Sequence, residues 1–146
     1  MSRQTPTIED YLETIYKLTK SKGYAKIVDI SEKLNVRPPT VTAMIQKLGE
    51  RDFLRHEKYR DVSLTQRGEE IAKTVSDRHA KIMKFLTILG VDDKTAYADT
   101  EGIEHHMHPT TLKKIHELVL FAEKNPGWLA DLKKFRKNKN IKRRNF

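Results

Sequence analysis

The ten residues TEGIEHHMHP, at positions 100–109, place two carboxylates and three imidazoles in a chain that contains no cysteine. On a helix, Glu101, Glu104 and His105 stand at i, i+3 and i+4, fall within about 100° of arc and converge on one side. Carboxylate oxygens and imidazole nitrogens are ligands for divalent ions, and the lack of thiols excludes disulfides and thiolate zinc sites. Three interpretations of this cluster stay open: a metal site, an acid/base pair, or a charged helix face.

The other side chains of the segment are expected to lie outside the cluster. His106 falls away from it, and His108 comes near it only if the helix continues to Pro109, so both histidines are predicted to be surface residues. Ile103 and Met107 point in another direction and are predicted to face packed side chains.

Further donors of the same chemical type occur on two other predicted helices. Asp10 and Glu13, three residues apart, share the polar face of the first helix, and His79 sits at the edge of the apolar stripe of a long central helix. Each has an alternative explanation. Acidic residues in a first helical turn favour the helix dipole, and a lone histidine at a stripe edge is more often a hydrogen-bonded core residue than a ligand.

Length and composition indicate the number of domains and the class of the protein. The 146 residues, 37% hydrophobic and 34% charged, suit one helix-rich domain or two small lobes. Apolar stretches fall far short of the roughly 18 residues that span a bilayer, and the N-terminus has no signal-type segment. We therefore expect a cytoplasmic protein with no membrane partner.

The net charge of +9 is concentrated at the C-terminal end. Residues 133–146, KKFRKNKNIKRRNF, carry eight Lys or Arg and no acidic residue. Such a run is either a solvated, frayed end or an accessory contact to a polyanion such as DNA.

Periodicity and turn signals predict a mainly α protein. Asn35 is expected to adopt a left-handed turn conformation, Thr65 and Asp92 to cap helices, and Gly23 and Gly90 to end them. The motif NPG at 125–127 is expected to break the chain before a short last helix. The predicted helices cover 6–21, 27–34, a stretch from 38 or 39 to about 48, 66–89, a fifth from about 93, 109–122 and a seventh from about 128, with strands at 53–57 and 62–65.

Helix, helix, turn, helix and then a two-stranded hairpin is the layout of a winged helix-turn-helix DNA-binding domain, here residues 1–70, followed by a helical domain at 71–146. A small helical domain with an unrelated hairpin is the alternative. Thr and Gln side chains can reach base edges or phosphates, and Lys and Arg neutralise the DNA backbone. The candidate DNA contacts are Arg37, Pro39, Thr40, Thr42, Gln46 and Lys47 on the third helix, and Lys58, Tyr59 and Arg60 on the hairpin tip.

The chain up to about residue 121 resembles the diphtheria-toxin-repressor-like metalloregulators. The resemblance is carried by IEDYLETIY (8–16), VTAMIQKL (41–48), EKYRDVSLT (57–65), RH (78–79), GVDD (90–93) and EGIEHH (101–106). It implies a winged-helix lobe, a helical dimerisation lobe and a metal site between them. The ligands that it implies here are Asp10, Glu13, His79, Glu101, Glu104 and His105.

Within that family the chain is most similar to the manganese transport regulators. Iron-responsive members carry softer, sulfur-containing side chains where Asp10 and Glu101 stand here, and they usually append a third domain. Four carboxylates and two imidazoles suit one or two ions of the Mn(II) class, for which other divalent ions can substitute.

The resemblance implies a repressor that binds double-stranded operator DNA as a metal-activated homodimer and controls manganese uptake genes. It implies no enzymatic activity and no small-molecule substrate. Two alternatives stay open: a dinuclear carboxylate enzyme on a helical scaffold, and a winged-helix regulator that needs no metal.

Overall fold

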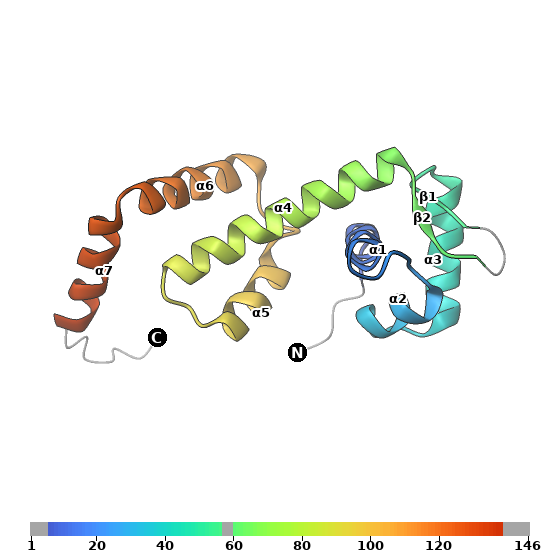
Figure 1. The fold of residues 1–146 in the computed structure, drawn as a ribbon, viewed down its shortest axis with the longest axis horizontal. Helices are drawn as coiled ribbons and strands as arrows, with labels where there is room; N and C mark the ends of the chain where they lie inside the picture. Colours follow the sequence, from blue (N-terminus) through green and yellow to red (C-terminus); the bar gives the residue numbers. More distant parts are fainter. Residues whose placement is uncertain (1–5, 57–59, 139–146) are drawn as a thin grey trace. The chain divides into compact units, whose positions relative to one another are not determined.

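The computed structural model describes residues 6–56 and 60–138, and the chain separates into two compact units, Met1–Asp77 and Arg78–Phe146. No helix in these described ranges is long and apolar enough to cross a membrane. The domain boundary predicted at residue 70 stays a prediction. The elements in chain order are α1 (Ile8–Lys22), α2 (Ile27–Leu34), α3 (Pro38–Glu50), β1 (Leu54–Arg55), β2 (Ser63–Leu64), α4 (Gln66–Ile88), α5 (Asp93–Ile103), α6 (Pro109–Lys124) and α7 (Pro126–Asn138), as Figure 1 shows.

Local signals in the sequence fix the helices of the first unit. The α1 helix begins with a capping box at Thr7 and ends at Gly23, whose φ of 84° lies in the left-handed region. Helix α2 has the predicted bounds and ends at Asn35, with φ 49° and ψ 52°. Helix α3 starts with Pro38 and Pro39 in its first turn, where their missing amides would be unpaired anyway. The predicted ends at Gly23 and Asn35 and the predicted start of α3 are confirmed, whereas α1 begins two residues later than predicted.

The wing of the first unit is shorter than the sequence predicts. Among the wing residues that the structure describes, the antiparallel ladder pairs Leu54 with Leu64 and Arg55 with Ser63. Beyond that pair, the amide of Val62 donates to the carbonyl of Ala25 at 2.8 Å, so it is not available to the ladder. The predicted tip residues Lys58 and Tyr59 lie outside the described residues.

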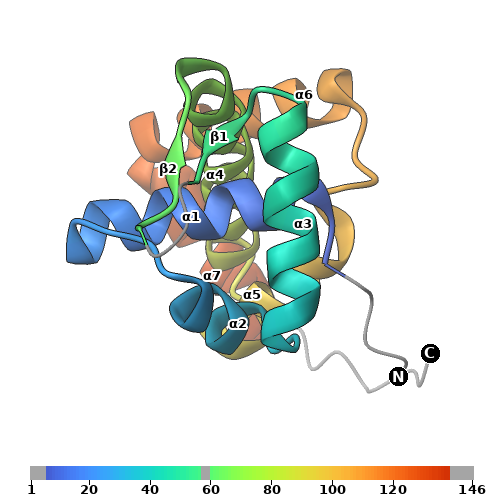
Figure 2. The same cartoon turned by 90° about the vertical axis from the view of Figure 1, so that its right-hand side faces the viewer.

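One apolar core holds the first unit together. Figure 2 shows α1 running across the axis of α3, with the two strands beside α3. Side chains from all three helices and the wing meet with almost no exposed surface, and they contribute the hydrophobic stabilisation that fixes the helix-turn-helix. The largest of those with less than 2% exposure are Tyr11, Leu12, Ile15, Ile30, Val41, Ile45, Leu48 and Val62.

Helix α4, which begins in the first unit and ends in the second, and helix α5, in the second unit, also begin at side-chain caps. The Thr65 hydroxyl accepts the Gly68 amide at 3.1 Å at the start of α4, and the Asp92 carboxylate accepts the Thr95 amide at 3.0 Å at the start of α5. Helix α4 is followed by Gly90, with a φ of 88°. Both predicted caps are confirmed.

The C-terminal end differs from the prediction in two respects. Pro126 and Gly127 do not break the chain but form the first turn of α7, because proline fits that position; the interruption is confined to Asn125. Helix α7 then continues to Asn138, so the first part of the basic segment is helical rather than frayed. The remaining residues of that segment, 139–146, lie outside the described ranges.

We expect Gly68→Ala to destabilise the first unit. A Cβ at this position would lie 1.9 Å from the carbonyl oxygen of Phe53, so β1 or α4 would have to shift. The expected loss in free energy of unfolding is about 1–3 kcal/mol, measured by urea denaturation. Gly127→Ala is the matched control, because nothing lies within 4 Å of its Cβ. Equal unfolding midpoints for both variants would contradict the packing described here.

Candidate metal centre

The candidate centre in the second unit is built on Glu104, whose side chain has 0% exposure. Helix α5 ends at Ile103, but Glu104 keeps helical dihedral angles (φ −60°, ψ −33°), and its amide donates to the Thr100 carbonyl at 3.0 Å. The helical spacing from Glu101 to Glu104 is therefore preserved, and the Glu104 carboxylate is turned into the interior of the unit.

Helix α4 brings an imidazole to this carboxylate. The Nδ1 atom of His79 lies 3.0 Å from Oε2 of Glu104 and 3.3 Å from Oε1 of Glu101. The His79 side chain is 11% exposed, whereas that of Glu101 is 42% exposed. The side of the cluster formed by His79 and Glu104 is thus shielded from solvent, whereas Glu101 borders solvent.

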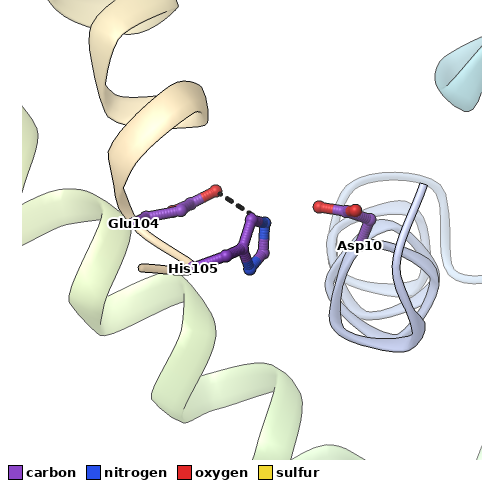
Figure 3. A group of neighbouring side chains, drawn as sticks. All are labelled: Asp10, Glu104 and His105. Atoms are coloured by element: carbon purple, nitrogen blue, oxygen red, sulfur yellow. Dashed lines mark ion pairs between the residues drawn. The ribbon is translucent and has the colours of Figure 1, made fainter. Parts of the chain in front are cut away.

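A second imidazole lies on the other oxygen of Glu104. The Nε2 atom of His105 is 3.5 Å from Oε1 of Glu104, the ion pair that is dashed in Figure 3. The Nδ1 atom of His105 lies 3.4 Å from a terminal nitrogen of Arg78. Four residues that the sequence singles out, His79, Glu101, Glu104 and His105, therefore come together in the second unit.

The cluster fits a divalent cation. Oε1 of Glu104 is buried and accepts no hydrogen bond, and among the described residues both ion-pair partners of this carboxylate are imidazoles, not Lys or Arg. A buried carboxylate oxygen that accepts no hydrogen bond is costly unless a cation meets it. Neighbouring ligands in an octahedral shell with bonds of about 2.1 Å lie about 3 Å apart, close to the separations between His79 and the two carboxylates. Oxygen and imidazole donors suit Mn(II) better than soft, thiol-seeking ions.

Two predicted ligands belong to the first unit. Asp10, shown on α1 in Figure 3, accepts hydrogen bonds from Thr7, and Oε1 of Glu13 lies 2.7 Å from Nζ of Lys17. Glu13 is buried, with 6% exposure. That these two carboxylates share an ion with the donors of the second unit stays a prediction.

The remaining residues of the histidine-rich segment follow the prediction in part. His106 and His108 are exposed, as expected, but His108 also caps α6 by accepting the Thr110 amide on Nδ1 at 3.2 Å, a role the sequence analysis missed. Ile103 is 41% exposed, so the expectation that it packs inward is wrong. The inward face of α5 is formed at four-residue spacing by Ala96, Thr100 and Glu104, and Ile103 lies one position off it.

Two neighbours of the cluster were not predicted. Arg78 contacts His105, and the ring of Tyr97 meets that of His79 edge-on, with centroids 5.5 Å apart. Tyr97, Glu101 and Glu104 share the i, i+4, i+7 spacing of one helix face, a signal that could have indicated the tyrosine. No comparable spacing rule links Arg78 to His105, which lies 27 residues further along the chain.

The chain is similar in sequence to a known protein family. The model of the iron dependent repressor N-terminal DNA binding domain matches residues 4–62, and that of the iron dependent repressor metal binding and dimerisation domain matches residues 65–128. The chain belongs to the iron-dependent repressor family. An HTH-type transcriptional regulator MntR of Listeria monocytogenes is 44% identical over 135 residues, which cover 92% of this chain and 95% of the relative. The resemblance predicted from the sequence is confirmed.

Solved members of this type share the fold. The crystal structure of T. acidophilum IdeR matches with a TM-score of 0.72 and 28% identity over 79% of this chain, and that of the manganese regulator SloR with 0.70 and 26% over 81%. The match covers 55% of each of those two chains, so this chain spans about half their length. The predicted winged helix-turn-helix followed by a helical domain is confirmed.

In this repressor-family chain, α3 presents a polar surface. Every α3-region residue predicted to touch DNA is exposed. The Thr42 hydroxyl donates to the Pro38 carbonyl at 3.1 Å, and the Gln46 amide donates to Glu50 at 3.5 Å. A surface hollow beside α3 includes Thr42, Gln46 and also His56 of the wing, which the sequence analysis did not select. The individual DNA contacts stay predictions.

We expect His79→Ala to weaken Mn(II) binding at least about tenfold, since it removes the imidazole that faces both carboxylates. Calorimetric titration of the full-length protein with Mn(II), without DNA, measures the effect. His106→Ala is the control, because His106 is exposed and its neighbour His105 carries the contact with Glu104. Indistinguishable affinities in the two variants would remove His79 from the centre.

Proposed function

We propose that this protein is a manganese-responsive transcriptional repressor that binds operator DNA as a metal-activated homodimer and controls manganese uptake genes. The observation that carries the proposal is the buried Glu104 carboxylate, flanked by His79 and His105, inside the stretch matched by a metal binding and dimerisation domain. The name of the solved manganese regulator, and the repressor family itself, support the choice of role.

The proposed ligand set adds Asp10 and Glu13 to the four donors of the second unit. Their support is their position in the motif IEDYLETIY and their hard, anionic oxygen donors. Together the six side chains offer four carboxylates and two imidazoles, enough for one or two Mn(II) ions. Mn(II) lies low in the general affinity order of divalent metals, so selectivity has to come from ligand type and geometry rather than from tight binding.

In this proposal, residues of both domains link metal binding to DNA binding. Glu104 and His79 hold the ion in the dry part of the second unit, and Glu101 closes the side that borders solvent. A bound divalent ion would supply positive charge to the buried Glu104 carboxylate, whose Oε1 accepts no hydrogen bond. Because Asp10 and Glu13 belong to the domain that binds DNA, occupancy of the full ligand set and operator binding become linked equilibria.

The DNA-binding surface proposed for this domain is the exposed side of α3. In helix-turn-helix proteins the second helix of the motif enters the major groove, and a dimer reads two half-sites. We assign base selection to the exposed Thr40, Thr42 and Gln46. Arg37, Lys47 and Arg60 supply the charges that neutralise phosphates, and Pro39 supplies an apolar contact at the start of the helix.

A dinuclear carboxylate enzyme is less well supported. Such centres usually repeat a Glu-x-x-His pair on two helices, and no such pair occurs in the sequence. The named relatives are transcriptional regulators. We therefore propose no enzymatic activity and no small-molecule substrate.

The proposal is tested by binding to a DNA fragment that carries the operator, measured with Mn(II), Fe(II), Co(II), Cd(II) and a chelator at fixed salt and pH. We expect Mn(II) to raise DNA affinity about 5- to 150-fold over the chelator, and the operator to raise Mn(II) affinity by the same factor. Equal DNA affinity with Mn(II) and with chelator would favour the metal-independent regulator instead.

We expect Arg60→Ala to weaken binding to every DNA sequence and to lower the slope of log affinity against log salt by about 0.9, the loss of one phosphate contact. Binding measured between 50 and 200 mM salt, in the range where such slopes are usually determined, gives the slope. Lys113→Ala, an exposed charge on α6, is the control for net charge. The same slope in both variants would place Arg60 away from DNA.

A further inference from the structure

The α1 helix begins with a reciprocal pair of hydrogen bonds between Thr7 and Asp10. The Thr7 amide donates to Oδ2 of Asp10 at 2.5 Å, and the Thr7 hydroxyl donates to the same oxygen at 2.8 Å. In return, the Asp10 amide donates to the Thr7 hydroxyl at 3.2 Å. Asp10 stands at the third position of the helix, where this capping box forms.

This arrangement fixes the direction of one carboxylate. Two donors on the same atom restrict the side-chain torsions of Asp10, which would otherwise sample several rotamers. A carboxylate has two oxygens and about four lone-pair sites, so it can accept two hydrogen bonds from Thr7 and still bind a cation. Capping and metal binding are therefore compatible uses of the same group.

We propose that Thr7 is a positioning residue for the metal centre, which holds the Asp10 carboxylate in the orientation that binds the ion. The inference rests on the proposed function, in which Asp10 is a ligand. Hydrogen bonds to ligating carboxylates fix their orientation, and loss of such a partner typically lowers metal affinity 10- to 100-fold. Nothing in the metal-ligand spacing of the sequence identifies Thr7; the capping contact does.

Two other roles for the Thr7 contact predict different results. A purely structural cap would change the stability of α1 without changing metal affinity. A competing contact, in which Thr7 draws the carboxylate away from the ion, would make metal binding tighter when the hydroxyl is removed. Of the three roles, only positioning predicts that removing the Thr7 hydroxyl weakens metal binding and that a different side chain with a hydroxyl restores it.

The test uses the full-length protein without DNA and titrates it with Mn(II), following the electron paramagnetic resonance signal of the free aqua ion. Thr7→Val keeps the shape of the side chain and removes the hydroxyl, and we expect about tenfold weaker binding. Thr7→Ser restores the hydroxyl and should return the affinity to within about twofold of the parent, since the same oxygen can again meet Asp10. Asp10→Ala should weaken binding at least as much as Thr7→Val.

Thr65→Val is the matched control, because it removes the cap hydroxyl of α4, whose partners are Gly68 and Asp52 rather than a proposed ligand. It should lower the thermal unfolding midpoint and leave Mn(II) affinity unchanged. The inference is overturned if Thr7→Val binds Mn(II) as well as the parent or better, or if Thr65→Val weakens binding equally, while Asp10→Ala still weakens it. If Asp10→Ala has no effect, the proposed ligand set fails and the inference fails with it.

Discussion

The carboxylate of Glu104 imposes the constraint on which the second unit depends. It has 0% exposure, and both of its oxygens face imidazole nitrogens. Removing a carboxylate from water costs several kcal/mol unless positive charge and hydrogen bonds replace the solvent, and Oε1 of Glu104 accepts no hydrogen bond. The backbone hydrogen bond from Glu104 to Thr100 keeps Glu104 on the helical path of α5, with its side chain on the buried face. The fold therefore holds a negative charge where a cation stabilises it.

The burial of Glu104 does not by itself decide which cations are suitable. The matching family models carry the word iron, whereas a solved structure of the same fold is called a manganese regulator, so names alone do not choose the metal. The donors do. A centre without any thiol, built from carboxylates and imidazoles, gives soft ions no advantage, and it favours ions that accept several oxygens in one shell. The burial of Glu104 adds charge neutralisation, which every divalent ion supplies, so discrimination must come from geometry.

Sequence reasoning succeeded where the signal is local and failed where it depends on partners distant in the chain. Caps at Thr65 and Asp92 and the left-handed turn at Asn35 are read from neighbouring residues, and they set the helix ends within one or two positions. The wing was overestimated because the amide of Val62 binds Ala25, 37 residues earlier, which no strand pattern reveals. The convergence of His79 on Glu104 was predicted from the family resemblance. The contact of Arg78 with His105 was not, because it needs the packing of α4 on the segment after α5.

The three helices that carry proposed ligands begin at side-chain caps, Thr7 for α1, Thr65 for α4 and Asp92 for α5, as α6 does at His108, whereas α2 and α3 have none. The Thr95 amide and hydroxyl hold the pKa of Asp92 below its ordinary value, so this cap is charged at neutral pH and its contribution is lost only as the pH falls through that lowered pKa. Each such cap stabilises its helix by about 0.5–2 kcal/mol without any contribution from an ion. The free energy of ion binding is then left to bias DNA binding, as a regulator requires.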